Sequence, residues 1–205
     1  MRLRCVHWIS VIPLRCDGSK APALKANEPQ IYSRRLPHDD ELLQWFGNPR
    51  TIRGLGLKCG VVSGGLEALD LDFAALLHPL LSMLSRQLIG KLTVVETPGG
   101  AHLLYRCNEI CGSRKIASWE SLQSLSQMTN GHRDGSNFQS VGKGVRIESR
   151  GEGGYIVAVA SPCETHASGK SYVQILGPPL PALQIISPEE RREMWLLNCS
   201  ISGLY

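Results

Sequence analysis

The sequence of 205 residues has no long apolar run, and this absence excludes a membrane-spanning helix. Such a helix needs about 18 or more consecutive apolar residues, whereas the apolar runs here are short segments such as 154–160. Internal repeats are also absent. The length excludes a multidomain machine, because about 100–200 residues usually make one domain. We therefore expect a single globular domain, residues 1–205, that buries its own core.

Excess charge and paired cysteines are lacking as well. The chain has 22 basic and 18 acidic side chains, and a net charge of +4 permits nucleic acid as a partner without demanding it. The seven cysteines are odd in number and lack the dense spacing of a disulfide scaffold. The first residues carry arginines and an apolar patch, but no small-residue cleavage site follows. Reduced thiols and a cytoplasmic location are the expectation.

Strand and turn signals predict an α/β domain dominated by antiparallel hairpins. Alternating apolar residues predict strands over 54–62 and 66–73, joined by the turn Ser63-Gly64-Gly65 into one hairpin. A second hairpin is predicted over 93–97 and 102–106, with Pro98-Gly99-Gly100 as its turn.

Helical signals are fewer. A stripe of apolar residues predicts a helix over 74–89, broken only near its start by Pro79. Acidic residues ahead of an apolar group predict a short helix over 39–46, with its Leu and Trp positions in the core. Residues 107–144 are rich in Ser, Gln and Gly, as expected for an insertion or mobile loop. Residues 178–205 are expected to be a C-terminal tail with a short helix.

Two aspartates stand two positions apart in the segment Leu69-Asp70-Leu71-Asp72. Successive strand residues point to opposite faces, so Asp70 and Asp72 should share a face with their carboxylates close together. Like charges so close repel each other unless a cation lies between them. Mg²⁺ and Mn²⁺ prefer such oxygen ligands. The alternative is a polar strand face in water, but apolar neighbours on the opposite face indicate an interior strand.

Two further patterns contain candidate functional residues. In Thr97-Pro98-Gly99-Gly100-Ala101-His102, a glycine turn allows a backbone to approach a phosphate, and a histidine begins the next strand. In Val145-Arg146-Ile147-Glu148-Ser149-Arg150, Glu148 shares a strand face with two arginines. Each pattern has an ordinary alternative, because a lone histidine is usually structural and an acid between arginines can be a surface salt-bridge row.

Together and in this order, three segments resemble the bifunctional primase–polymerase domain of plasmid and phage replication proteins, in the archaeo-eukaryotic primase superfamily. They read GVVSGGLEALDLD, TPGGAHLLY and IESRGEGGYIVA. Smaller matches are Ile12-Pro13-Leu14 with Gly18-Ser19-Lys20-Ala21-Pro22 near the start, and Ser161-Pro162, His166, Ser168-Gly169 and Tyr172 near the end. The resemblance runs from about residue 11 to residue 190.

The resemblance implies a fold, a set of site residues and a cofactor. The fold is α/β (α+β), an RRM-like, mainly antiparallel sheet that carries the acids and packs against a smaller N-terminal α/β unit. Asp70, Asp72 and Glu148 correspond to the catalytic acids that hold two Mg²⁺ or Mn²⁺ ions. The residues implied to contact the nucleotide are His102, Gly99, Gly100, Lys20 and Arg150. Glu148 is one methylene longer than the aspartate that relatives also have at its position.

The activity implied is template-dependent nucleotidyl transfer that makes primers and extends them as a DNA polymerase during plasmid or phage replication. Its partners would be single-stranded DNA, nucleoside triphosphates and a separate replicative helicase, with no membrane. One alternative is a non-catalytic nucleic-acid-binding module for replication initiation, which the complete set of acids argues against. A two-metal nuclease is another, less favoured by the glycine turn.

A zinc site is a weaker hypothesis. Cys107 and Cys111 lie after the predicted histidine strand, with His132 downstream, and Cys163 with His166 could serve equally well. Their spacing does not define four ligands. Free or buried thiols are the commoner outcome.

Overall fold

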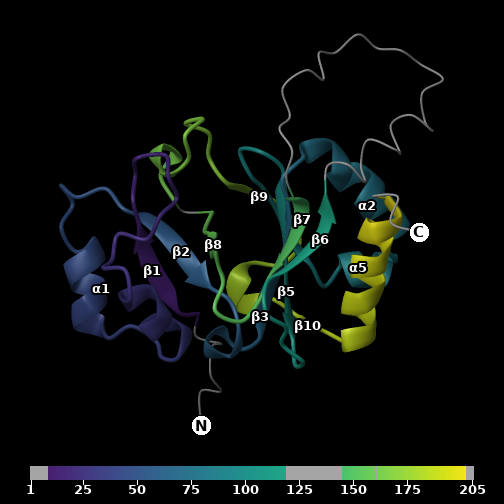
Figure 1. Cartoon of the computed structure of the whole chain (residues 1–205), viewed down its shortest axis with the longest axis horizontal. Helices are drawn as coiled ribbons and strands as arrows, with labels where there is room; N and C mark the ends of the chain where they lie inside the picture. The colour runs from purple at the N-terminus through teal and green to yellow at the C-terminus, as the bar shows by residue number, and fades with distance from the viewer. Residues whose placement is uncertain (1–8, 119–144, 160, 202–205) are drawn as a thin grey trace.

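The computed structural model describes residues 9–118, 145–159 and 161–201, which form three layers (Figure 1). A seven-stranded sheet lies in the middle, with helices on one face and a three-stranded sheet on the other. The strands are β1 (Val11–Leu14), β2 (Gly54–Lys58), β3 (Leu66–Leu71), β4 (Thr93–Glu96), β5 (Ala101–Cys107), β6 (Arg114–Ser118), β7 (Val145–Arg150), β8 (Tyr155–Val157), β9 (Val173–Leu176) and β10 (Ile185–Ile186). The α-helices are α1 (Asp39–Phe46), α2 (Leu77–Met83), α3 (Arg86–Ile89) and α5 (Pro188–Ile201). Short 3₁₀ turns are η1 (Glu28–Ser33), η2 (Val61–Ser63), η3 (Ala74–Leu76), η4 (Cys163–Thr165) and η5 (Leu180–Ala182).

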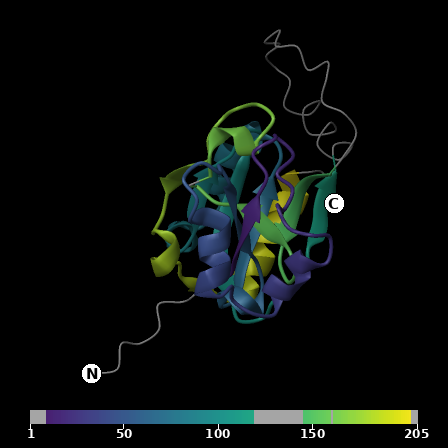
Figure 2. The same ribbon diagram turned by 90° about the vertical axis from the view of Figure 1, so that its left-hand side faces the viewer.

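The large sheet has the strand order β6-β7-β3-β5-β4-β9, with antiparallel pairing throughout, and β10 adds a short parallel pairing to the end of β5. The small sheet has the order β1-β2-β8, also antiparallel. β1, η1, α1, β2 and β8 together make a smaller unit, called the N-terminal unit below, whose α1 and β1 face the viewer in Figure 2. The predicted fold class is confirmed.

The alternation of β3 divides the interior into two cores. Leu69 and Leu71 point toward α2, α3 and α5, whereas Leu66 and Ala68 point toward the small sheet. All four side chains are fully buried, as expected for a central strand covered on both faces. Asp70 belongs to the second face, so this acid lies where the sheet meets the N-terminal unit.

The hairpin predicted over 54–62 and 66–73 is wrong. β2 pairs with β1 and β8, β3 pairs with β5 and β7, and a single bridge between Gly60 and Leu66 is the remnant of the expected pairing. Gly60, Gly64 and Gly65 all have positive φ angles and turn the chain from one sheet into the other. The second predicted hairpin is confirmed, because β4 and β5 pair from Thr93 opposite Leu104 to Glu96 opposite Ala101.

The helix predicted over 74–89 is also wrong, because α2 and α3 are separate. Leu84 has an extended backbone, and the Ser85 side chain accepts a hydrogen bond from Leu88 N to start α3. Pro79 lies in the first turn of α2, where its missing N–H is not needed.

Three further segments differ from prediction. α1 has the predicted bounds but buries no residue, and Leu43 is 70% exposed, because α1 lies on the outside of the N-terminal unit. Residues 114–118 form β6 instead of belonging to an insertion, and residues 119–144 lie outside the described ranges. α5 is no tail helix, because Met194 is buried in the core and Arg191 pairs with the buried Glu67 of β3.

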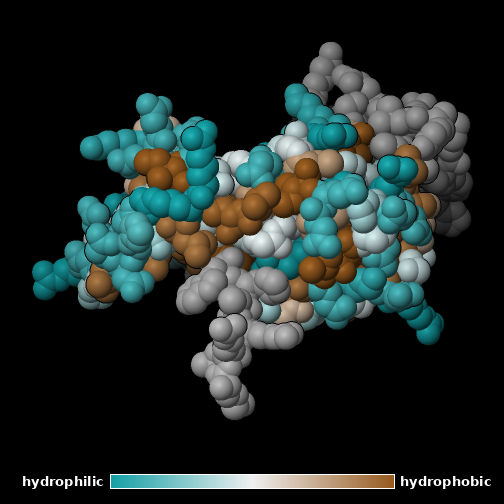
Figure 3. All heavy atoms as spheres, turned by 90° about the horizontal axis from the view of Figure 1, so that it is seen from below, coloured by the Kyte–Doolittle hydropathy of each residue, from teal (hydrophilic) through white to brown (hydrophobic). Residues whose placement is uncertain are grey.

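The surface mixes polar and apolar side chains. Seen from below, apolar patches alternate with polar side chains (Figure 3). Exposed large apolar residues such as Val61 and Ile52 are ordinary for a folded domain. Within the described residues, none of the helices combines the length and apolarity that crossing a membrane would take.

Candidate active site

Three predicted site residues form a row across the centre of the large sheet. Asp70 on β3 lies directly opposite Glu148 on β7 and directly opposite His102 on β5. Directly opposed residues of antiparallel strands project from the same face. His102 Nε2 lies 3.4 Å from Asp70 Oδ1. The strand register therefore brings together side chains that lie far apart in the sequence.

Arg150 connects the two acids of this row. It lies two residues beyond Glu148 on β7, so its side chain is on the same face. Its Nη2 is 2.8 Å from Glu148 Oε2 and 3.3 Å from Asp70 Oδ2. One guanidinium thus serves two carboxylates.

Asp70 is held in its charged form. Burial by itself would raise the pKa of this carboxyl. The hydrogen bond from His102 and the charges of His102 and Arg150 outweigh burial, so the pKa of Asp70 lies below its ordinary value. The side chain is 15% exposed, so a negative charge is kept at the sheet surface with little water around it.

A cavity of about 300 Å³, called the candidate pocket below, lies over this row. Six of the eight predicted site residues line it, namely Lys20, Asp70, Asp72, Gly99, His102 and Arg150. Glu148 and Gly100 are not in its lining. The walls come from both units, because Lys20 and Tyr155 belong to the N-terminal unit and its loops, and the other predicted residues belong to the large sheet.

The two glycines of the β4–β5 turn have different surroundings. Thr97 N donates to Gly100 O, and Gly100 N donates to Thr97 Oγ1. A Cβ on Gly100 would lie 1.9 Å from Leu71 O, so only glycine allows the turn to pack against the chain that leads to Asp72. A Cβ on Gly99 would meet nothing within 4 Å. Gly99 is therefore the glycine open to the pocket.

Lys20 has an unusual backbone. Its φ angle is 60°, the one positive value at a non-glycine residue in the described part of the chain. Its carbonyl accepts a hydrogen bond from the Tyr155 hydroxyl. Left-handed backbone at a residue with a side chain costs free energy and is commonly retained at functional sites.

His166 and Tyr172 also line the pocket, and sequence reasoning gave them no role. The Tyr172 ring lies 6.0 Å from the His102 ring and 6.5 Å from the His166 ring, measured between centroids. Burial, followed by the Asp70 charge, raises the pKa of Tyr172 to about 12, so its hydroxyl stays protonated. Both residues were in the family pattern Ser-Pro…His…Ser-Gly…Tyr, which was the available signal.

Comparison with known protein families supports the resemblance seen in the sequence. The family described as "Bifunctional DNA primase/polymerase, N-terminal" matches residues 3–189. The chain belongs to this family. Membership indicates a nucleotidyltransferase of the primase/polymerase type that acts in DNA replication and binds DNA and nucleotides. Among curated proteins, no match was found.

Nucleotidyltransferases of the primase/polymerase family generally use divalent metals. No three His, Cys, Asp or Glu side chains are gathered into a metal-holding group in residues 9–118, 145–159 and 161–201. The donor chemistry nevertheless fits, because Asp70, Asp72 and Glu148 offer the oxygen ligands that Mg²⁺ and Mn²⁺ prefer. The guanidinium shared by Asp70 and Glu148 marks a position where these acids stabilise a cation. For zinc, His132 lies outside the described residues, so that hypothesis stays a prediction.

Proposed function

We propose that this primase/polymerase domain is a template-dependent nucleotidyltransferase that makes primers and extends them as a DNA polymerase, in plasmid or phage replication. The observation that carries the proposal is the row of Asp70, Glu148 and His102 beneath a pocket that also contains Lys20 and Arg150. Acids on a rigid sheet, with cationic side chains in the same cavity, suit a substrate that has both a triphosphate and a metal ion.

The acids would hold the metal, and the other residues would hold the nucleotide. Asp70, Asp72 and Glu148 are the proposed ligands of Mg²⁺ or Mn²⁺, which supplies Lewis-acid stabilisation of phosphate charge when bound. Lys20, Arg150 and His102, which line the same pocket, are the proposed contacts of the triphosphate, and Gly99 would leave room for close approach. In the reaction the primer 3′-oxygen forms a bond to the α-phosphorus, and pyrophosphate leaves.

The negative charge on pyrophosphate has to be stabilised as the bond between its oxygen and the α-phosphorus breaks. Lys20 and Arg150 line the pocket from different elements, one in the loop after β1 and the other at the end of β7. Two cations fix the orientation of a polyphosphate better than one. Template DNA, nucleoside triphosphates and a separate replicative helicase are the proposed partners.

One observation favours a second candidate function. Because Arg150 already pairs with Asp70 and Glu148, the acids could be neutralised permanently in a domain that only binds nucleic acid at an origin of replication. Such a module would keep the fold and its affinity for single-stranded DNA but would transfer no nucleotide.

The deciding experiment is nucleotide incorporation on a single-stranded DNA template with Mn²⁺ or Mg²⁺. We expect product from the wild type and none from Asp70→Asn/Asp72→Asn. The matched control is Asp39→Asn/Asp40→Asn, which removes two exposed aspartates at the start of α1 and should leave activity unchanged. Product from the Asp70/Asp72 variant, or no product from the wild type, would overturn the proposal. Template binding without product from the wild type would support the binding module.

A further inference from the structure

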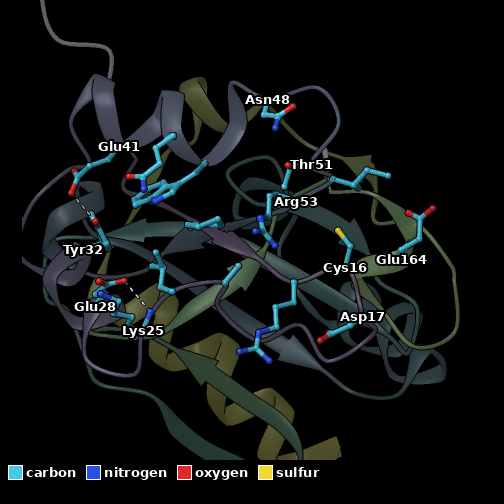
Figure 4. Close-up of a pocket in the computed structure, with 17 residues that line it drawn as sticks. Cys16, Asp17, Lys25, Glu28, Tyr32, Glu41, Asn48, Thr51, Arg53 and Glu164 are labelled. Carbon is cyan, nitrogen blue, oxygen red and sulfur yellow. Dashed lines mark hydrogen bonds between the residues drawn. The ribbon is translucent and has the colours of Figure 1, made fainter.

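A second large hollow is distinct from the candidate pocket. It has a volume of about 1080 Å³ and lies in the N-terminal unit between the end of β1, η1, α1 and the loop before β2 (Figure 4). We call it the N-terminal groove. Its lining is rich in charged and amide side chains, and none of the motifs of the sequence analysis explains it.

The acids of the groove are mostly occupied by donors of the protein. Both carboxylate oxygens of Glu41 bind Arg35 at 2.7 Å, and the Tyr32 hydroxyl donates to the same carboxylate. Glu28 accepts the backbone N–H of Lys25, and Asp17 accepts that of Ser19. Figure 4 shows Glu164, the remaining acid, at the edge of the groove.

The cations of the groove, unlike most of its acids, are not occupied by partners within the described part of the protein. Arg15, Lys25 and Arg53 are exposed, and their side chains form no ion pair with the residues that the structure describes. Arg53 points into the middle of the groove (Figure 4). Four acids also line the groove; one of them, Glu41, is neutralised by Arg35, and the three cations are available to a ligand.

The groove also offers an aromatic surface. Trp45 of α1 lines it, half-buried, and packs edge-on against the Tyr32 ring at 4.9 Å between centroids. Gln44, Asn48 and Thr51 lie beside it and supply neutral hydrogen-bonding groups. A fixed aromatic ring beside unpaired cations is the combination by which proteins hold single-stranded nucleic acid, because bases stack and phosphates pair.

A third hollow adjoins both the groove and the candidate pocket. It has a volume of about 340 Å³, shares Leu24 and Lys25 with the groove, and shares Gly153 and Tyr155 with the pocket. The buried Lys58 helps to form this hollow, because its Nζ donates to Gly153 O at 2.7 Å. The three hollows therefore adjoin one another in sequence, from the acids of the large sheet to Trp45.

We infer that the N-terminal groove binds the single-stranded DNA on which the enzyme acts. The strand passes from the candidate pocket beside Tyr155 and Lys25 into the groove, with phosphates on Arg15 and Arg53 and a base on Trp45. That the bound strand is the template rests on the proposed function. That the groove binds single-stranded DNA rests on its own charges, its aromatic ring and the third hollow that adjoins it and the pocket.

Binding of a labelled oligothymidylate, followed by fluorescence anisotropy over a range of salt concentrations, tests the inference. The test variant is Arg15→Ala/Arg53→Ala. The control, Arg86→Ala/Arg192→Ala, removes two exposed arginines from α3 and α5, on the opposite face of the large sheet. Loss of two phosphate contacts should weaken binding and reduce the slope of log K against log salt by about 1.4. The control variant should retain the wild-type slope.

A second variant separates stacking from charge. Trp45→Ala should weaken binding about tenfold with no change in the salt slope, and Trp45→Phe should restore most of the affinity because it retains an aromatic face. Circular dichroism of each variant checks that the N-terminal unit is folded. Equal weakening by both arginine pairs would mean bulk charge alone, and it would overturn the inference. Unchanged binding by Arg15→Ala/Arg53→Ala would overturn it as well.

These outcomes can be told apart from failure of the proposed function. Adding Arg15→Ala/Arg53→Ala to Asp70→Asn/Asp72→Asn should weaken oligonucleotide binding by the same factor as in the wild-type background, because the Asp70 and Asp72 substitutions lie outside the groove. Groove-dependent binding by a wild type that transfers no nucleotide would refute the proposed function and leave the inference standing. A wild type that transfers nucleotides but binds the strand equally well with and without Arg15 and Arg53 would refute the inference and leave the proposed function standing.

Discussion

Two clusters in this molecule pair carboxylates with an arginine, and they differ in charge balance. In the N-terminal unit, one acid, Glu41, binds one arginine, Arg35, through both of its oxygens. At the centre of the large sheet, two acids, Asp70 and Glu148, share Arg150. Exposure does not distinguish the clusters, because the acid side chains are 19%, 15% and 21% exposed in that order.

The comparison separates an ion pair that stabilises the fold from one that leaves charge for a ligand. The hydrogen bonds from Arg35, followed by those from the His38 N–H and the Tyr32 hydroxyl, outweigh burial and lower the pKa of Glu41 to about 2. That cluster has no unbalanced charge. In the Asp70 cluster the two carboxylates outnumber the one guanidinium, and bringing a divalent cation there would lower their energy. Charge balance, more than burial, distinguishes the candidate site from the stabilising ion pair.

The largest expected effect comes from replacing one acid of each cluster by its neutral amide and comparing the two variants. Asp70→Asn should reduce nucleotide incorporation at least about a thousandfold, because metal-ion stabilisation of phosphate charge provides several kcal/mol. It should lower the free energy of unfolding by less than Glu41→Gln does, because the pKa of Asp70 lies below its ordinary value and the ionised carboxylate contributes to stability, but its site is not charge-balanced. Glu41→Gln should lower that free energy by about 1 kcal/mol and reduce incorporation far less than Asp70→Asn does, because Glu41 lies outside the candidate pocket.

Incorporation assays measure the activity of both variants, and urea denaturation measures their free energies of unfolding. An active Asp70→Asn enzyme would show that the Asp70 cluster is not needed for nucleotide transfer. A variant Asp70→Asn that is less stable than Glu41→Gln would show that the central cluster is also a stabilising ion pair.

The glycine turn beside the central cluster gives the next effect in size. Gly100→Ala should destabilise the protein by about 3 kcal/mol, because its Cβ would collide with the Leu71 carbonyl and force the backbone apart. Gly99→Ala is the control and should change stability by less than about 0.5 kcal/mol, since its Cβ meets no atom. Thermal denaturation compares the two. Equal destabilisation by the two variants would mean that the close packing of Gly100 against Leu71 does not fix the conformation of the chain that leads to Asp72.

A smaller effect is expected from removing each arginine. Arg150→Met should bind Mn²⁺ about fivefold more tightly than the wild type, because a partly exposed ion pair worth about 1 kcal/mol no longer competes with the metal. Arg35→Met should bind Mn²⁺ as the wild type does. Isothermal titration of the nucleotide-free protein measures both. Weaker binding by Arg150→Met would show that the arginine supports the metal site instead of occupying it.

The sequence allowed prediction of six residues of the candidate pocket because they lie in segments with local signals. Asp70 is in an apolar strand, and Gly99 and His102 belong to a turn and strand that form a hairpin in the structure as expected. The pairing of β2 with β8 could not be predicted in the same way. The turn at Ser63-Gly64-Gly65 carries an ordinary hairpin signal, whereas the true partner of Leu57 is Ile156, far along the chain.

The shared arginine and the N-terminal groove were beyond sequence reasoning for a similar reason. That Arg150 reaches Asp70 as well as Glu148 depends on the register of β7 on β3, which a one-dimensional pattern does not contain. The groove joins residues from β1, η1, α1 and the loop before β2, and each of these segments taken alone resembles an ordinary polar surface. Non-local pairing therefore creates both features.

The smallest expected effect is a dependence on pH confined to the balanced cluster. The folded-state pKa of Glu41, about 2, lies below the ordinary value of 4.5. Its contribution to stability is therefore fully present above pH 4.5 and is lost as the pH falls toward about 2. The difference in free energy of unfolding between wild type and Glu41→Gln should shrink across that window, as measured by urea denaturation at a series of pH values. Both proteins contain Asp70, so its acid titration cancels when the two are compared. A difference in free energy of unfolding that stays constant on acidification would contradict the prediction. It would mean that packing of the Tyr32 and Trp45 rings, and not the ion pair, stabilises this cluster.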